Sequence, residues 1–236
     1  MFNPGRNYEQ IRTTIAINQM PVKICGMHAG VSVGPDGATH QMLEDIGMMR
    51  MLPHMTVIAP GDAEEARKAV VAAAATTTPV YLRFGRTATP VFTTPATPFE
   101  IGKALMLWDS EHPQLALLST GSLSYQTLQA ASALAKKGVD SVVLHLPTIK
   151  PLDTEAVLMA AKRVGRVVTV EEHQAAGGFG SAVTEFLAEH HPVPIKILGV
   201  RDQFGQSGTP EELLAHYGLD ARSIEAAAQA FVAPKV

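Results

Sequence analysis

The sequence predicts two three-layer α/β domains with mainly parallel sheets, and three observations support this fold class. Short apolar segments alternate with alanine-rich amphipathic segments along almost the whole chain. The apolar segments are continuous rather than alternating in polarity, which is typical of parallel strands covered on both faces. A region rich in proline and threonine, residues 86–99, interrupts this alternation. Such a composition indicates a linker, so we expect one domain at residues 1–98 and a second at 99–236.

The alternation begins with a helix expected from Arg6, and seven apolar segments are then expected to form strands. In chain order these segments are residues 22–26, 55–60, 80–85, 115–121, 141–146, 166–172 and 195–200. Strands separated by helices predict right-handed crossover connections. Three strands fall in the first expected domain and four in the second, so the second has enough elements for its own core.

Helix starts are marked by capping residues at three positions. Asp62, Asp153 and Thr209 each place a side-chain oxygen before an amphipathic segment. Glu65 stands three residues after Asp62, and Pro210 directly follows Thr209. A capping oxygen followed by a carboxylate or a first-turn proline is typical of a helix N-terminus. We therefore expect helices to begin at these positions.

The segment GPDGATHQMLED, residues 34–45, is expected to form a tight turn that leads into a helix. Its Pro-Asp-Gly sequence favours a turn because proline presets φ, aspartate binds its own backbone and glycine allows positive φ. Thr39 precedes apolar residues at helical spacing, so it is the expected N-cap, with His40 in the first turn. The turn accounts for Asp36 and Thr39 but leaves His40 unexplained.

Three polar side chains make this loop a candidate binding site. His28 follows the strand at 22–26, and Asp36 and His40 come within the next twelve residues. Ligands of open α/β sheets bind at the carboxyl ends of the strands, where this loop is expected. Each of the three could instead be a structural hydrogen-bonding group, and the sequence leaves both interpretations open.

Two further segments allow more than one interpretation. Arg83 and Arg86 lie on or just after an apolar strand, so each either meets an acid in the core or binds an anionic ligand. The segment EEHQAAGGFGSAV, residues 171–183, resembles a phosphate-binding loop. Its glycines are explained better by close packing of a strand against a helix, and no Walker lysine is present.

Composition restricts the classes of partner and the compartment. The net charge is −3 and the isoelectric point is near 6.3, so neither nucleic acid nor an anionic membrane is an expected partner. No apolar run has the length of a membrane span, and the first residues lack a signal core, which predicts a cytoplasmic protein. The single Cys25 is expected to be a buried, reduced thiol. No Cys/His spacing for zinc occurs, so no metal site is expected in this chain.

Three longer segments resemble the C-terminal half of transketolase, in particular the form that is divided into two subunits. They are FNPGRNYEQIR, VKICGMHAGVSVGPDGATHQMLEDIGMMRMLPHMTVIAPGDAEEA and VEEHQAAGGFGSAVTEFL. The similarity keeps the order of the motifs and covers almost the whole chain. It implies a pyrimidine-binding domain followed by a transketolase C-terminal domain, and transfer of a two-carbon ketol unit between sugar phosphates in carbohydrate metabolism.

The resemblance also implies roles for individual residues. Phe2 matches an aromatic residue that stacks on the aminopyrimidine ring of thiamine diphosphate. His28 and His40 match two histidines that face the substrate, and Asp36 matches an acid that binds a substrate hydroxyl. Arg83 matches an arginine that binds the substrate phosphate, and the spacing also allows Arg86 in that role.

The cofactor and partner implied by the resemblance are thiamine diphosphate and an N-terminal transketolase subunit. The family's activating glutamate lies before the Phe2 motif, and its Mg²⁺ and diphosphate site lies on another domain. The segments that carry them do not occur in this sequence, so we expect Mg²⁺ to be held by the partner subunit, and a homodimer of the chain within the complex. A truncated gene start, strands supplied by another chain and a loss of activity remain alternative explanations.

Two other function classes remain as alternatives. Within thiamine enzymes these are deoxyxylulose-phosphate synthase and a 2-oxoacid dehydrogenase beta-type subunit. His28 argues against the synthase, whose loop carries an arginine before Ala-Gly, and DGATHQ argues against the dehydrogenase subunit. The remaining alternative is a non-catalytic assembly fragment.

Overall fold

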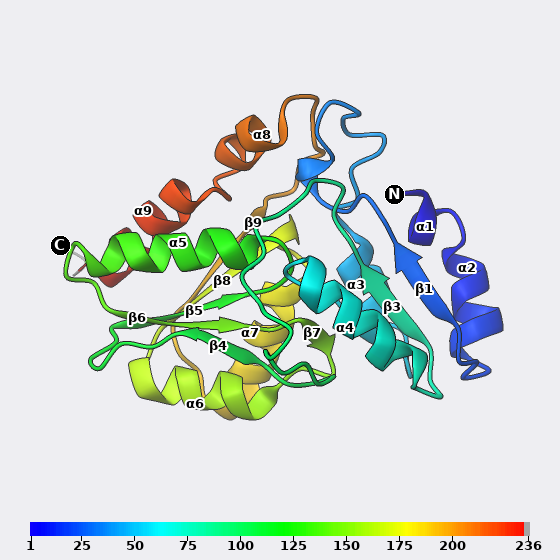
Figure 1. Ribbon diagram of the computed structural model, residues 1–236, viewed down its shortest axis with the longest axis horizontal. Helices are drawn as coiled ribbons and strands as arrows, with labels where there is room; N and C mark the ends of the chain where they lie inside the picture. The colour runs from blue at the N-terminus through cyan, green and yellow to red at the C-terminus, as the bar shows by residue number, and fades with distance from the viewer. Residues whose placement is uncertain (234–236) are drawn as a thin grey trace.

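A computed structural model of the chain describes residues 1–233 and contains two β-sheets with helices on their faces (Figure 1). The first sheet has the strand order β1-β3-β2-β7, and the second has the order β4-β6-β5-β8-β9. All strand pairs are parallel except β2 with β7 and β4 with β6. The α/β fold class with mainly parallel sheets is therefore confirmed.

The strands are β1 (Lys23–Gly26), β2 (Thr56–Ile58), β3 (Val80–Arg83), β4 (Leu105–Trp108), β5 (Leu115–Ser119), β6 (Ser141–His145), β7 (Thr148–Lys150), β8 (Val167–Gln174) and β9 (Ile195–Val200). All seven expected strands are present, while β4 and β7 were not anticipated. β4 lies at a sheet edge and is only partly buried. β7 is a three-residue strand between Pro147 and Pro151, too short to show a periodic pattern.

The helical elements are α1 (Phe2–Gly5), α2 (Tyr8–Gln10), the π-helical turn η1 (Ile11–Ala16), the 3₁₀ turn η2 (Val31–Val33), α3 (Asp45–Arg50), α4 (Ala63–Ala74), α5 (Leu123–Ala135), α6 (Thr154–Val164), α7 (Phe179–His190), α8 (Pro210–His216) and α9 (Ala221–Val232). The three expected capping residues are confirmed. Asp62, Asp153 and Thr209 each accept a hydrogen bond from a backbone N–H of the first turn.

The expected helix start at Thr39 is wrong. Helix α3 begins at Asp45, and residues 35–40 form turns instead. The His40 N–H donates to the Gly37 carbonyl at 3.0 Å, and Gly37 has φ of +71°. The Thr39 hydroxyl lies 2.9 Å from Nδ1 of the His40 ring, and this contact takes the place of the expected cap on a backbone N–H.

Helices α3 and α4 cover opposite faces of the first sheet. Ile58 and Leu82 pack in one cluster with Ala69 of α4. Val57, the neighbour of Ile58 on β2, packs in another cluster with Met49 of α3. Successive strand residues point to opposite faces, so this sheet is buried from both sides.

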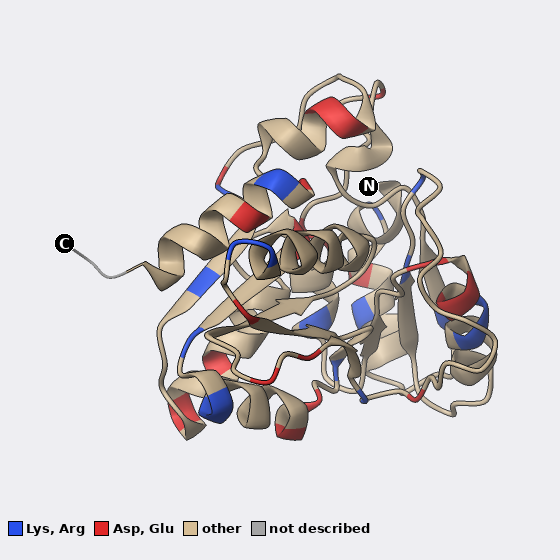
Figure 2. Cartoon of the chain, turned by 60° about the vertical axis from the view of Figure 1, so that its left-hand side comes forward, with Lys and Arg blue, Asp and Glu red and all other residues tan. Residues whose placement is uncertain are grey.

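The second sheet is covered in the same three-layer way. Helix α5 contacts β5 and β6 and also packs against α9, while α6 contacts β5 and α7 contacts β8 and β9. Figure 1 shows α5 and α9 on one side of this sheet and α6 and α7 on the other. The strands carry few charged residues, which lie mainly on helices and loops (Figure 2).

The two sheets share one hydrophobic core. The largest cluster of buried side chains combines residues of the first sheet with residues of the second, such as Tyr81 with Leu118. Strand β7 belongs to the C-terminal part of the chain but pairs with β2 of the first sheet. Hydrogen bonds also attach the linker to α4. The N-cap Asp62 accepts from the backbone N–H groups of Phe92 and Thr93, and the Lys68 ammonium donates to two linker carbonyls.

We propose a domain boundary between residues 98 and 99, and limited proteolysis tests it. Residues 94–96 are exposed, so we expect the first cut within residues 86–99. Because the two parts share a core and the β2–β7 pair, the fragments should stay bound to each other and separate only in denaturant. Main cleavage inside residues 115–200, mapped by mass spectrometry, would contradict the boundary.

Two remaining expectations concern burial and membranes. Cys25 is exposed rather than buried, because it lies on β1, which forms an edge of the first sheet and alternates between buried and exposed residues. Within residues 1–233, every helix is too short or too polar to cross a membrane.

Candidate functional site

The loop between β1 and α3, residues 27–44, carries His28, Asp36 and His40 and has an unusual backbone. We call it the β1–α3 loop. His28 has φ of +59°, and Gly30 has φ of +85°. A left-handed conformation at a residue with a Cβ persists only where surrounding contacts hold it, and it is frequent at functional sites. Here the Ala29 N–H donates to the Phe84 carbonyl at 3.0 Å and the Gly30 N–H donates to the Met42 carbonyl at 2.8 Å.

The side chain of Gln41 ties this loop to the loop at residues 201–208. Its amide nitrogen lies 3.0 Å from the Val31 carbonyl, 3.3 Å from the Gly34 carbonyl and 2.9 Å from the Gln206 carbonyl. Gln41 is buried, so these hydrogen bonds fix the loop against the C-terminal part of the chain. The 201–208 loop, which has no recognisable motif, is thus a support for the candidate site.

Asp36 and Arg86 form an ion pair across the β1–α3 loop. Arg86 Nη1 lies 2.8 Å from Asp36 Oδ2 and 3.1 Å from the Val33 carbonyl oxygen. The side chains are 38% and 42% exposed for Asp36 and Arg86 respectively. The guanidinium is therefore held in place and still accessible to an anion from solvent.

His40 and Phe2 also lie together, although they are far apart in the sequence. Their rings meet edge to face, with centroids 5.3 Å apart. The Arg6 guanidinium lies 4.8 Å from the centroid of the Phe2 ring. Phe2, His28 and His40 are all exposed. These side chains are therefore available to a ligand at the surface of the chain.

Arg83 has a different environment from Arg86, because it is buried in an ion pair. Its Nε donates to Asp45 Oδ2 at 2.8 Å, and Tyr81 donates to the same oxygen at 2.8 Å. Arg83 Nη2 donates to the Met42 carbonyl at 3.3 Å and the Glu172 carbonyl at 2.8 Å. Burial alone would raise the pKa of Asp45, but the charge and hydrogen bond of Arg83 outweigh it and lower that pKa. For Arg83 the sequence left open a buried acid or an anionic ligand as its partner, and the structure shows a buried acid, Asp45.

Arg83 also lines a cavity at the carboxyl ends of β2, β3 and β5. The cavity has a volume of about 390 Å³, and Ser122 and Glu172 line it as well. A buried chain of hydrogen bonds lies nearby: Glu65 Oε2 is 2.7 Å from His145 Nε2, and His145 Nδ1 is 2.6 Å from Ser124 Oγ. These three side chains are almost completely buried, so they connect α4 to the second sheet rather than act on a ligand.

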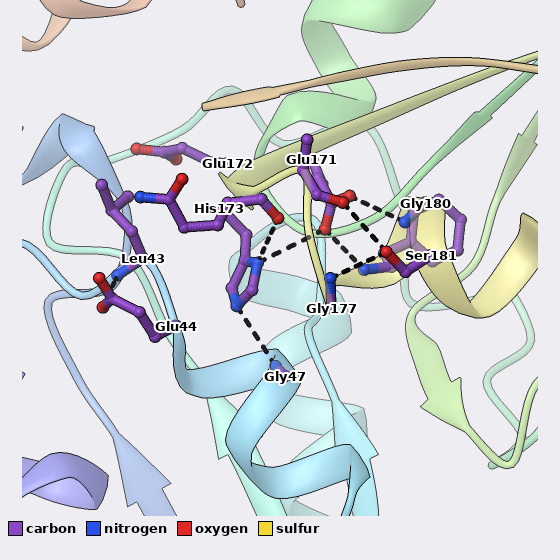
Figure 3. A network of polar contacts seen from close by, with 12 residues as sticks. Leu43, Glu44, Gly47, Glu171, Glu172, His173, Gly177, Gly180 and Ser181 are labelled. Atoms are coloured by element: carbon purple, nitrogen blue, oxygen red, sulfur yellow. Dashed lines mark hydrogen bonds and ion pairs between the residues drawn. The ribbon is translucent and has the colours of Figure 1, made fainter. Parts of the chain in front are cut away.

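The glycine-rich segment 171–183 packs a strand against a helix, as expected. Figure 3 shows Glu171 directed at the start of α7, where its carboxylate accepts the Phe179 N–H at 2.6 Å and the Gly180 N–H at 2.8 Å. A Cβ at Gly178 would overlap the Glu171 carboxylate. The helix N-terminus that could have bound a phosphate is thus occupied by a carboxylate of the chain itself.

His173 lies beside this carboxylate and joins β8 to α3 (Figure 3). Its Nδ1 is 2.7 Å from the Gln174 carbonyl, and its Nε2 accepts the Gly47 N–H at 3.3 Å. These partners assign the neutral tautomer with the proton on Nδ1. Burial lowers the pKa of His173 to about 4. Burial also raises the pKa of Glu171 to about 7, although the two backbone N–H groups that its carboxylate accepts oppose this rise.

Several residues of this region were not found from the sequence. Asp45, Gln41 and Glu172 become important only through partners on distant strands and loops. The one visible signal was a pair of glutamates inside an apolar strand, because buried carboxylates are rare unless they are bound. Among residues 1–233, no group of three or more His, Cys, Asp or Glu side chains is placed to hold a metal ion.

The fold and site define a class of α/β proteins in which polar residues gather where parallel strands end. Comparison with protein-family models gives a more specific match. Residues 1–91 match the transketolase pyrimidine-binding domain, and residues 102–224 match the transketolase C-terminal domain. The chain therefore belongs to the transketolase family.

Known proteins of similar sequence and structure agree with this assignment. A subunit of the apulose-4-phosphate transketolase of Phocaeicola vulgatus is 40% identical over 98% of this chain and 73% of its own length. A solved structure described as split gene transketolase, inactive beta4 tetramer, superposes with a TM-score of 0.90 at 40% identity, covering 98% of this chain and 73% of that one. The 1-deoxy-D-xylulose-5-phosphate synthase of Trichormus variabilis is 38% identical over 93% of this chain, but only 35% of its own length is covered.

Proposed function

We propose that this chain is one subunit of a split, thiamine-diphosphate-dependent transketolase that moves a two-carbon ketol unit between sugar phosphates. The observation that carries the proposal is the β1–α3 loop, which holds His28, Asp36 and His40 at the end of a parallel strand. Hydrogen bonds of Gln41 and of the backbone hold this loop in place, and the side chains of His28, Asp36 and His40 are exposed. Fixed donors at a strand end are suited to a small polar substrate.

The two imidazoles are proposed to donate hydrogen bonds to oxygens of the substrate. Such donors stabilise negative charge that develops on oxygen during transfer of the two-carbon unit. Asp36 is proposed to accept a hydrogen bond from a substrate hydroxyl, which discriminates against analogues without that hydroxyl. The Asp36 carboxylate also positions Arg86 through their ion pair.

Arg83 and Arg86 remain the two candidates for binding the substrate phosphate. Arg86 has the better support, because it is exposed and its single acidic partner is itself on the surface. Arg83 already uses Nε and Nη2 for Asp45 and two carbonyls. A bidentate fork toward a phosphate needs guanidinium N–H groups that have no other partner.

Thiamine diphosphate would supply the electron-accepting chemistry that lets the two-carbon unit leave its donor sugar. Phe2 fits a role beside this cofactor, because the residue is 45% exposed and its ring meets His40 edge to face. We propose that the Phe2 ring packs on the aminopyrimidine, next to the site imidazoles. We propose that Mg²⁺ and the diphosphate are held by the partner subunit.

The proposed partner is an N-terminal transketolase subunit, within a complex that also contains two copies of this chain. The relative from Phocaeicola vulgatus is named as one subunit of a transketolase, and the related solved structure is named as an inactive tetramer of beta chains. Both names support a site completed by a second kind of chain. On this basis we also propose that the working protein is in the cytoplasm, where sugar phosphates occur.

An assay with and without the partner tests the proposal. The purified chain is mixed with thiamine diphosphate, Mg²⁺, xylulose 5-phosphate and ribose 5-phosphate, alone and with the candidate partner subunit. We expect no turnover from the chain alone and transfer of a two-carbon unit once the partner is added. Turnover by the chain alone would contradict our account of where the cofactor is held.

The same assay separates the alternatives. The synthase alternative is favoured by one observation, the identity to the Trichormus variabilis enzyme, and it predicts that pyruvate and glyceraldehyde 3-phosphate are consumed instead. A 2-oxoacid dehydrogenase subunit would consume a 2-oxoacid without a sugar acceptor. A non-catalytic assembly fragment would bind the partner and leave all these substrates unchanged.

A further inference from the structure

Glu172 is a buried carboxylate that the proposed reaction does not use. It lies on β8, is 4% exposed, and follows Glu171 directly in the sequence. The two carboxylates point to opposite sides of β8, as successive strand residues do (Figure 3). Glu171 faces α7, while Glu172 faces the β1–α3 loop.

The Glu172 carboxylate is hydrogen-bonded to the centre of this loop. Oε1 accepts the Ser32 N–H at 2.5 Å, and Oε2 accepts the Ser122 hydroxyl at 3.1 Å. Ser32 is the middle residue of η2, between His28 and Asp36 in the sequence. A charged acceptor makes a shorter and stronger hydrogen bond to a backbone N–H than a neutral one does.

Because Gly30 has no side chain, it leaves room for the Glu172 carboxylate. A Cβ at Gly30 would overlap the carboxyl group of Glu172. Gly30 has φ of +85° and lies two residues after His28, which itself has φ of +59°. The backbone at Gly30, two residues after the left-handed His28, is therefore packed directly on the Glu172 side chain.

The main chain of Glu172 is held from the same side. Arg83 Nη2 donates to the Glu172 carbonyl, and Arg83 is fixed in turn by Asp45. Burial raises the pKa of Glu172, while the Ser32 N–H and the charge of Arg83 oppose the rise. The Glu172 carbonyl and one of its two carboxylate oxygens are thus bound to residues of the N-terminal part, although Glu172 belongs to the second sheet.

We infer that Glu172 is a positioning residue of the candidate site: its carboxylate holds Ser32 and Gly30, and through them sets the orientation of His28. The effect of Glu172 on turnover rests on the proposed function. Its effect on the orientation of His28 does not depend on that function. The C-terminal domain would then contribute to the reaction without touching the substrate.

Nuclear magnetic resonance of the full chain tests the orientation without any activity. The signals are the Ser32 amide and the ring signals of His28 and His40, assigned from the variants His28→Gln and His40→Gln. In Glu172→Ala we expect the Ser32 amide to lose its low-field position and the His28 ring signals to move. In Glu172→Gln the His28 ring signals should stay near the wild type, because the amide oxygen still accepts the Ser32 N–H and the amide nitrogen can donate to Ser122. The Ser32 amide should move only part of the way, because its acceptor is present but no longer charged.

Glu171→Ala is the matched control. It removes the same group from the neighbouring position of the same strand, and it leaves the hydrogen bonds of Glu172 intact. We expect it to lower stability while the Ser32 and His28 signals stay in place. If Glu172→Ala does not fold, Glu172→Asp replaces it, because the shorter side chain withdraws the carboxylate from Ser32.

Activity of the reconstituted complex gives the second measurement. A misplacement of about 1 Å can cost about 10²-fold in rate, so Glu172→Ala should lose about that factor in kcat/KM, and Glu172→Gln should restore it. Unmoved His28 and Ser32 signals in Glu172→Ala and Glu172→Asp would overturn the inference. If the signals move in Glu172→Ala but the wild-type complex transfers no two-carbon unit, the proposed function is refuted and the positioning role of Glu172 stands.

Discussion

Replacing His28 or His40 with alanine in the reconstituted complex is expected to slow turnover by about 10² to 10³-fold with little loss of stability. The loss of one oxyanion donor costs about 2.7–4 kcal/mol in the barrier. Both side chains are exposed, and the hydrogen bond of the His40 ring is to its neighbour Thr39. Their removal therefore takes little from the core, and kcat should fall far more than the melting temperature.

His54 provides a matched control for His28. It is also an exposed histidine, and it has φ of +65°, close to the +59° of His28. It precedes β2, so it lies at the amino end of the sheet, away from the β1–α3 loop. His54→Ala should turn over normally. If the His28 and His40 variants melt early and still turn over normally, both are structural histidines and the site is elsewhere.

The second large effect is expected from the two arginines, which should behave oppositely. Arg83→Met leaves Asp45 buried without its cation, and breaking a buried pair costs about 3–5 kcal/mol. Asp45 would then lose the interaction that holds its pKa low. Arg86→Met removes an exposed ion pair, which contributes about 0–1 kcal/mol. It should leave stability unchanged and raise KM for phosphorylated substrates.

Denaturant unfolding of the chain and steady-state kinetics of the complex separate these outcomes. An unphosphorylated acceptor sugar is the control substrate, because its KM should not respond to Arg86→Met. A stable Arg83→Met variant with a raised KM would reverse the assignment and make Arg83 the phosphate-binding residue.

The fold could be predicted well where the signal is local. The strands at 115–119 and 141–145 are runs of apolar residues, and Asp62 and Thr209 mark helix starts by their own side chains. The turn at Thr39 could not be predicted correctly, because Gln41, two residues later, binds the distant Gln206 carbonyl, and the sequence gives no sign of that partner.

The candidate site was predictable in part for the same reason. His28, Asp36 and His40 lie on one short loop, so their proximity follows from the sequence. The contact of Phe2 with His40 and the ion pair of Asp36 with Arg86 join residues that lie far apart in the chain. The pairing of Glu172 with Ser32 spans 140 positions. Nothing in the composition of either segment specifies such a partner.

Strand β7 has a consequence for the order in which the protein can assemble during synthesis. The chain leaves the ribosome from its N-terminus, so β1, β2 and β3 emerge well before Thr148–Lys150, which form the strand that pairs with β2. Until then the outer edge of β2 has unpaired N–H and C=O groups, and such an edge can pair with another nascent chain. Strand β7 follows β5, α5 and β6 in the chain, so the first sheet can form its β2–β7 pair only after these elements have been synthesised. The N-terminal part therefore cannot finish folding before the C-terminal part has begun to fold.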